Sequence, residues 1–131
     1  MSPPRSVAVI GVSNDLREYG NKAVRANRDT GWQVCPVHPT EATAESLPAY
    51  YPVNTIPAPL EVASLYVPQA IGVARLPAIA VRKPPGVWIN PGAESDELLL
   101  AGDKSGLNVV QACSIRAVGK SPANYPHLSF A

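Results

Sequence analysis

The chain has 131 residues, of which 46% are apolar, and its 11 Lys and Arg residues nearly balance its 10 Asp and Glu residues, leaving a net charge of +1. This length predicts a single domain over 1–131 that buries about two thirds of its unfolded surface, with loose ends at 1–4 and 121–131. The near-neutral charge argues against a nucleic acid or an anionic membrane as a partner, because either would select a broad basic surface.

The first predicted strand is the unbroken apolar run 6–11, which ends at Gly11. Such a run is typical of a central parallel strand that is covered on both faces. A polar loop then leads to a helix, with Asn21 as the expected N-cap and Gly31 as the residue just past the end. A second apolar strand follows at 32–37.

The proline-containing segment 40–60 predicts a meandering connection with at most a short helix or strand. A third strand is expected at 62–67, and Pro68 can open the helix that follows it. Four apolar residues share one face of this second helix: Ile71, Ala74, Ala78 and Val81. Pro77 should kink or split it.

A fourth strand is predicted over 86–90, and the turn Pro91-Gly92 follows it. The third helix should run over 95–105, because Ser95 is a good N-cap and the two residues after it are acidic, which suits the positive end of a helix. A fifth strand is expected at 107–111.

Strands that alternate with helices in this way predict an α/β, three-layer Rossmann-like fold with a five-stranded, mostly parallel sheet. Ligands on such sheets bind beyond the carboxyl ends of the strands. The residues that follow each strand should therefore converge on one crevice.

The turn after the first strand does not match a dinucleotide-binding fingerprint, because Ser13 and Leu16 occupy two of its three glycine positions. NAD sites also need an acidic residue after the second strand to hold the ribose hydroxyls. This chain has His38 and Pro39 there, and Glu41 follows too late. A G-x-x-x-x-G-K-S/T phosphate loop is absent as well.

The same turn still suits an anion. Gly11 permits a tight turn, while Ser13 and Asn14 offer side-chain donors. Arg17 and Lys22 add positive charge near a helix N-terminus, which itself favours anions. The alternative is an ordinary strand–helix connection whose charges are solvated.

Several short segments stand in a specific order along the chain: Val9-Ile10-Gly11-Val12-Ser13-Asn14, Tyr19-Gly20-Asn21-Lys22, Gly31-Trp32-Gln33-Val34, Pro36-Val37-His38-Pro39, Ile56-Pro57, Tyr66-Val67-Pro68, Gly86-Val87-Trp88-Ile89 and the segment around Cys113. Together they resemble the small stand-alone CoA-binding domain proteins. Those proteins share their Rossmann-like fold with the CoA-binding domain of the succinyl-CoA synthetase α subunit. The resemblance covers about residues 5–118.

The resemblance implies that the ligand is coenzyme A or an acyl-CoA. The CoA phosphates would be surrounded by Gly11, Val12, Ser13, Asn14, Arg17, Tyr19 and Gly20. The nucleotide end would be flanked by Pro36, His38 and Pro39. The pantetheine arm would run along Tyr66, Val67, Pro68, Ile89, Asn90 and Pro91, and Cys113 would lie near its thiol end.

The sequence departs from the family pattern at two places. His38 stands where the family usually has Asn, and Gln111-Ala112-Cys113 replaces the usual Asp-Arg-Cys. His38 could serve as a general base or a phosphate partner, or it could be a plain loop histidine. For Cys113 the hypothesis is a mixed disulfide with CoA. Mass spectrometry of protein that has been incubated with CoA disulfide would test it.

The function predicted from the sequence is therefore binding of CoA or acyl-CoA without catalysis. Three alternatives stay open: a module that senses NAD(H) or another nucleotide, an enzyme that uses CoA as a thiol substrate, and a protein-interaction domain without a small ligand. The sequence does not indicate an acyl preference, a protein partner or whether the chain forms a homo-oligomer.

The two cysteines, Cys35 and Cys113, are expected to be reduced thiols, and no metal-ligand spacing occurs. The N-terminus lacks the pattern of a secretion signal, and no apolar stretch approaches about 18 residues. We therefore expect a cytoplasmic protein.

Overall fold

The structure is a computed structural model that describes residues 5–12, 14, 18–57, 59–67 and 69–125. Its strands are β1 (Ser6–Ile10), β2 (Gln33–Val37), β3 (Thr43–Ala44), β4 (Leu47–Pro48), β5 (Val62–Leu65), β6 (Gly86–Ile89) and β7 (Val109–Gln111). Its helices are α1 (Tyr19–Asp29), α2 (Gln69–Arg82), α3 (Asp96–Lys104) and α4 (Ser114–Ala117), with 3-10 turns η1 (Val53–Thr55) and η2 (Pro122–Asn124).

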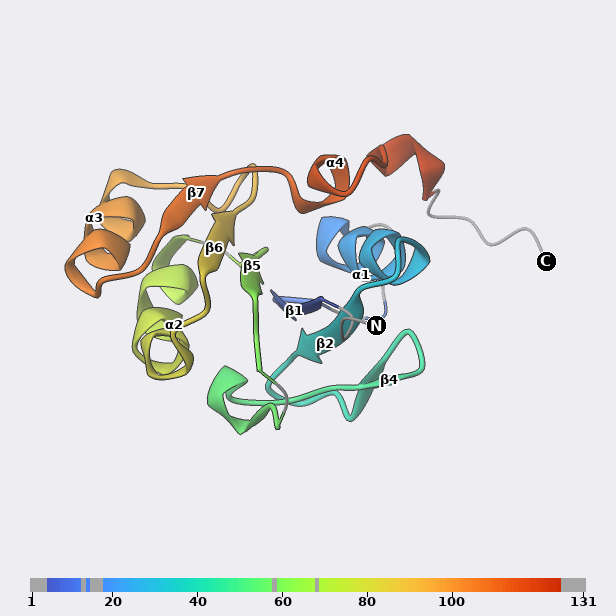
Figure 1. Ribbon diagram of the computed structural model, residues 1–131, viewed down its shortest axis with the longest axis horizontal. Helices are drawn as coiled ribbons and strands as arrows, with labels where there is room; N and C mark the ends of the chain where they lie inside the picture. Colours follow the sequence, from blue (N-terminus) through green and yellow to red (C-terminus); the bar gives the residue numbers. More distant parts are fainter. Residues whose placement is uncertain (1–4, 13, 15–17, 58, 68, 126–131) are drawn as a thin grey trace.

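Five parallel strands form one sheet in the order β2-β1-β5-β6-β7 (Figure 1). β1 lies inside it, and its residues alternate between two hydrophobic clusters. Val7 and Val9 face one cluster, whereas Ala8 and Ile10 face the other. The unbroken apolar run is explained by this double burial. The predicted α/β, Rossmann-like fold with a five-stranded sheet is confirmed.

Helices cover both faces of the sheet and make three layers. One cluster joins the sheet to α2, α3 and η1, and its largest buried helical side chains are Leu76, Ile79 and Leu98. The other joins the sheet to α1 and α4, with Val24 and Ile115 fully buried. Figure 1 shows α2 and α3 on one side of the strands and α1 and α4 on the other.

The predicted start of the first helix was wrong by two residues. α1 begins at Tyr19, and Asn21 is a fully buried residue inside it, not its N-cap. The Asn21 amide donates to Glu45 of the β3–β4 hairpin, at 3.4 Å, so the side chain serves a tertiary contact. Glu18 occupies the N-cap position without a side-chain capping bond.

The second helix buries a different face from the one its apolar residues suggest. Gly72, Leu76 and Ile79 are buried, whereas Ile71 is 41% exposed and Val81 is 68% exposed. The sheet lies on the Leu76 side, and Ile71 faces a cleft instead. The helix also continues through Pro77, so the expected split does not occur.

Two segments carry structure that the sequence pattern left undefined. β3 and β4 form a small antiparallel hairpin whose turn residues Glu45 and Ser46 have positive φ values of 50° and 65°. In the segment that begins at 121, Tyr125 is buried, and its hydroxyl bonds Asp29 at 3.1 Å. Within the described part of the chain, every helix is too short or too polar to span a membrane.

Candidate functional site

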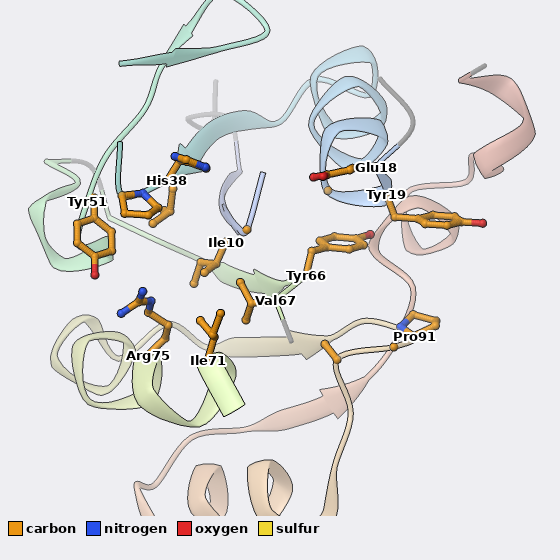
Figure 2. Close-up of a pocket in the computed structure, with 16 residues that line it drawn as sticks. Ile10, Glu18, Tyr19, His38, Tyr51, Tyr66, Val67, Ile71, Arg75 and Pro91 are labelled. Carbon is orange, nitrogen blue, oxygen red and sulfur yellow. The ribbon is translucent and has the colours of Figure 1, made fainter. Parts of the chain in front are cut away.

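The site lies where the direction of strand addition reverses. The chain passes from β1 to β2 on one side, and it later returns to β5 on the other side of β1. The Tyr66 N–H donates to the Ile10 carbonyl at 2.8 Å, so the segments that follow β1 and β5 stay side by side. Open α/β sheets bind ligands at such a reversal. A cleft of about 740 Å³ opens here (Figure 2).

The cleft brings together eight of the residues predicted from the sequence, contributed by four separate parts of the chain. They are Gly11, Tyr19, Gly20, His38, Pro39, Tyr66, Val67 and Pro91. A neighbouring recess of about 280 Å³ is lined by Ile89 and Cys113 and shares Pro91 with the cleft. Ten of the predicted residues therefore border one of these two adjoining spaces.

The other predicted residues fall into two groups. Val12, Asn14, Pro36 and Asn90 line neither space; all but Asn14 are buried. Ser13, Arg17 and Pro68 lie outside the described residues, so their expected contacts stay predictions.

Eight further residues line the cleft: Ile10, Glu18, Val37, Tyr51, Ile71, Arg75, Gly92 and Ala93. Val37 and Gly92 belong to the strand-end segments that were expected at the crevice, whereas sequence reasoning missed the other six residues. Tyr51 comes from the proline-rich connection and Arg75 from the body of a helix. No local signal marks either as a site residue, because only tertiary packing brings it to the cleft.

Two glycines allow the backbone segments of the site to touch. Gly11 has a φ of +97°, and a Cβ there would lie 2.6 Å from a Val67 side-chain carbon and 2.8 Å from the Tyr66 carbonyl oxygen. A Cβ on Gly20 would lie 2.9 Å from the Gly11 carbonyl oxygen. The β1 turn is thus pressed between the start of α1 and the end of β5, and only glycine fits at either contact.

The N-terminus of α1 is open toward the cleft. The Lys22 N–H donates to the Glu18 carbonyl at 3.1 Å, so the backbone N–H groups of Tyr19 and Gly20 come before this bond, at the start of the helix. The Lys22 ammonium adds positive charge beside them, 5.2 Å from the centre of the Tyr19 ring. The positive dipole end of a helix and the N–H groups of its first turn favour an anion.

Asn14 ties the β1 turn to the β3–β4 hairpin. Its amide nitrogen donates to the Thr43 carbonyl at 3.1 Å, and its amide oxygen accepts from the Glu45 N–H at 3.2 Å. Arg28 of α1 in turn donates to the Glu45 carbonyl at 3.0 Å. The Asn14 side chain is therefore engaged in positioning the turn, a role that the sequence did not predict.

The His38 ring is held by its own loop. Its Nδ1 accepts from the backbone N–H groups of Thr40 and Glu41, at 3.1 and 3.0 Å. An accepting Nδ1 places the proton of the neutral ring on Nε2, which makes His38 a hydrogen-bond donor through that atom.

Tyr66 forms part of the cleft wall between β1 and α4. Its hydroxyl is buried and makes no hydrogen bond of ordinary geometry with a described residue. The nearest polar groups are those of Ser114 and Ile115 at the start of α4. Burial is the main cause that raises the pKa of Tyr66 far above its ordinary value, and Cys113 adds to the shift. The Tyr66 ring therefore stays neutral at any physiological pH.

The two thiols differ in exposure, and this predicts different reactivity. Cys35 is buried in β2, and burial raises the pKa of its thiol, whereas Cys113 is half-buried at the edge of the recess. We expect Ellman's reagent to modify Cys113 quickly in the folded protein and Cys35 only on unfolding. Peptide mass spectrometry after partial labelling would identify the site. Equal labelling of both cysteines under native conditions would contradict the expectation.

A family model described as a CoA binding domain matches residues 5–119. A conserved hypothetical protein from Pyrococcus furiosus is 26% identical, over 86% of this chain and 98% of its own, with a TM-score of 0.78. A protein from Thermus thermophilus is 23% identical, over 86% and 87% of the two chains, with a TM-score of 0.78.

The fold also occurs within a larger enzyme. A dinucleotide-forming acetyl-coenzyme A synthetase from Ca. Korarchaeum cryptofilum aligns over 82% of this chain but only 25% of its own, with 23% identity and a TM-score of 0.72. No match was found among curated proteins. Because the family model spans nearly the whole described fold, this chain belongs to the CoA-binding domain family.

Proposed function

We propose that this protein binds coenzyme A or an acyl-CoA in the cleft between β1, β5 and α1, and that it does so without catalysing a reaction. The observation that carries the proposal is the position of the α1 N-terminus, set directly against the Gly11 turn and lining a largely apolar cleft. Such a site offers donors to a diphosphate and leaves room for an extended apolar arm on either side.

The diphosphate would lie against Gly11 and Gly20. Because neither position carries a side chain, the β1 turn packs directly against the start of α1 and the end of β5, which keeps these backbone segments together at the cleft. An anion placed there would also interact favourably with the positive end of the α1 dipole.

The nucleotide would lie at the end of β2, beside His38 and Pro39. Among the described residues that line the cleft, Glu18 is the one with a carboxylate, and it belongs to the N-terminus of α1. No acidic side chain of the described lining therefore stands after β2, where an NAD site holds its ribose diol. This absence favours CoA over NAD as the ligand.

The pantetheine arm would extend the other way, past Val67 and Pro91. Pro91 borders both the cleft and the recess that Cys113 lines, so the two spaces adjoin along the route proposed for the arm. The arm needs little more than apolar walls and a few backbone partners, and this path supplies both.

Thermal unfolding in the presence of CoA, acetyl-CoA, NAD, NADP and ATP tests the function. A ligand at 100 times its dissociation constant stabilises by about 2.7 kcal/mol, which raises the melting temperature of a domain of this size by roughly 10 °C. We expect such a shift with CoA and none with NAD. An equal shift with NAD, or no shift with CoA, would contradict the proposal.

A matched pair of variants on α2 localises the effect. Ile71→Glu places a negative charge in the cleft, which should repel the CoA phosphates and remove most of the shift. Val81→Glu places the same charge on an exposed apolar position of the same helix outside the cleft, and it should keep the shift. If both variants respond to CoA like the original protein, the ligand binds elsewhere.

A further inference from the structure

The cleft has a polar end that the diphosphate and the pantetheine arm do not use. Figure 2 shows His38, Tyr51 and Arg75 gathered at this end, whereas Glu18, Tyr19 and Pro91 lie toward the other. Three separate parts of the chain contribute to it: the loop after β2, the segment before η1, and the middle of α2.

Arg75 reaches the cleft because it lies one helical turn after Ile71, and residues four apart share a helix face. Both line the cleft, while the opposite face of α2 packs on the sheet. Tyr51 is positioned by strand-like pairing at the end of β2, where the Tyr50 N–H donates to the Pro36 carbonyl at 2.9 Å and the Tyr50 carbonyl accepts from His38 N.

Arg75 is the one residue with a permanent positive charge among the described residues that line the cleft. No described carboxylate lies within ion-pair distance of it. The other arginines of α1 and α2 are engaged elsewhere: Arg25 lies over the Tyr125 ring, Arg28 pairs with Glu45, and Arg82 donates to the Ile56 carbonyl.

The Arg75 guanidinium lies over the Tyr51 ring in a cation–π contact, with 5.0 Å between its central carbon and the ring centre. A cation–π contact of this kind helps to hold the guanidinium at the cleft and does not use its N–H groups, which can donate to a ligand. A planar fork of donors on an aromatic platform suits two oxygens of a phosphate.

We propose that Arg75, held by Tyr51, binds the 3′-phosphate on the ribose of coenzyme A and makes the protein selective for ligands that carry this phosphomonoester. The inference rests on the proposed function, because that function puts the nucleotide at the end of β2. It adds a specificity-determining contact beyond the diphosphate site.

The test is calorimetric titration of the full chain with CoA and with 3′-dephospho-CoA, which differ only in this phosphate. Because a charge-assisted, forked contact is lost, we expect dephospho-CoA to bind about tenfold to a hundredfold more weakly. In Arg75→Ala this difference should shrink to about threefold or less. Arg75→Lys should retain part of it, since the charge remains but the fork is lost.

Lys104→Ala is the control for the general loss of one positive charge, because Lys104 is exposed at the end of α3 and away from the cleft. It should leave the preference for CoA unchanged. The preference for a 3′-phosphate can also be tested on the unaltered protein, by comparing adenosine 3′,5′-bisphosphate and ADP as competitors of CoA. The bisphosphate should displace CoA at the lower concentration.

Three results would overturn the inference. Equal binding of CoA and dephospho-CoA would end it while leaving CoA binding itself intact. An equal loss of affinity for both ligands in Arg75→Ala would assign Arg75 to another part of the ligand. Failure of both ligands to bind the unaltered protein would refute the proposed function and this contact with it.

Discussion

Gly11→Ala should lower the free energy of unfolding by about 3 kcal/mol or more and remove the response to CoA. Two penalties combine at this position. An L-residue at positive φ costs roughly 1–2 kcal/mol, and the φ of Gly11 is +97°. The added methyl group would also lie 2.8 Å from the Tyr66 carbonyl oxygen, a backbone atom that cannot turn away. Urea denaturation followed by circular dichroism would measure the loss.

Gly31→Ala is the matched control for that prediction. Gly31 follows α1 with a φ of +89°, but a Cβ there meets nothing within 4 Å. It therefore carries the conformational penalty alone, and we expect a cost of about 1–2 kcal/mol with CoA binding retained. The difference between the two variants measures the close approach of β1 and β5. If both lose the same stability, the contact beside Gly11 is looser than described and the turn can relax around a side chain.

The strands of the central sheet could be read from the sequence because burial on both faces leaves an uninterrupted apolar signature. β1, β2 and β5 carry that signature, and the residues after them could then be assigned to one crevice by the topology of parallel sheets. Helix α3 was also predictable, since Ser95 caps it and accepts from the Leu98 N–H at 3.0 Å. These elements follow from local chemistry alone.

The errors share a different physical origin. Asn21 is a good N-cap by type, but its side chain is drawn into a contact with Glu45, far away in sequence. Ile71 is apolar yet faces the cleft, because a binding surface also needs apolar walls. Periodicity cannot separate a cleft face from a core face when both are apolar. Arg75 and Tyr51 were missed for the same reason, since tertiary packing alone brings them together.

Asn90 was expected to line the site, but the structure places its side chain in the protein interior. It directly follows β6 and precedes Pro91, and the resemblance to the CoA-binding domain proteins implied that it lines the path of the pantetheine arm. Its side chain is fully buried, and it donates to the Ser64 hydroxyl at 2.7 Å and to the Leu65 carbonyl at 2.9 Å. Its amide oxygen accepts from the Ser114 N–H at 2.7 Å. One side chain thus joins β5, β6 and α4.

Asn90→Ala should therefore act on stability, with an expected loss of about 3–5 kcal/mol. The substitution leaves the Ser114 N–H and the Ser64 hydroxyl buried without these partners, at about 1–3 kcal/mol each, and it opens a small cavity. Much of the total stability of a domain of this size would be lost. Urea denaturation would measure the loss, and calorimetric titration with CoA below the unfolding transition would measure the affinity.

Asn108→Ala is the matched control, because Asn108 is exposed and its amide makes only a marginal contact, 3.5 Å from the Pro85 carbonyl. It should change stability by less than about 0.5 kcal/mol. The comparison separates two roles for Asn90. If it holds the end of the sheet together, the unfolding free energy falls while the folded fraction still binds CoA with nearly its original affinity. The opposite result would be that Asn90→Ala is as stable as the control variant but loses affinity for CoA. The Asn90 amide would then contact the ligand, and its hydrogen bonds to Ser64 and Ser114 would contribute little to stability.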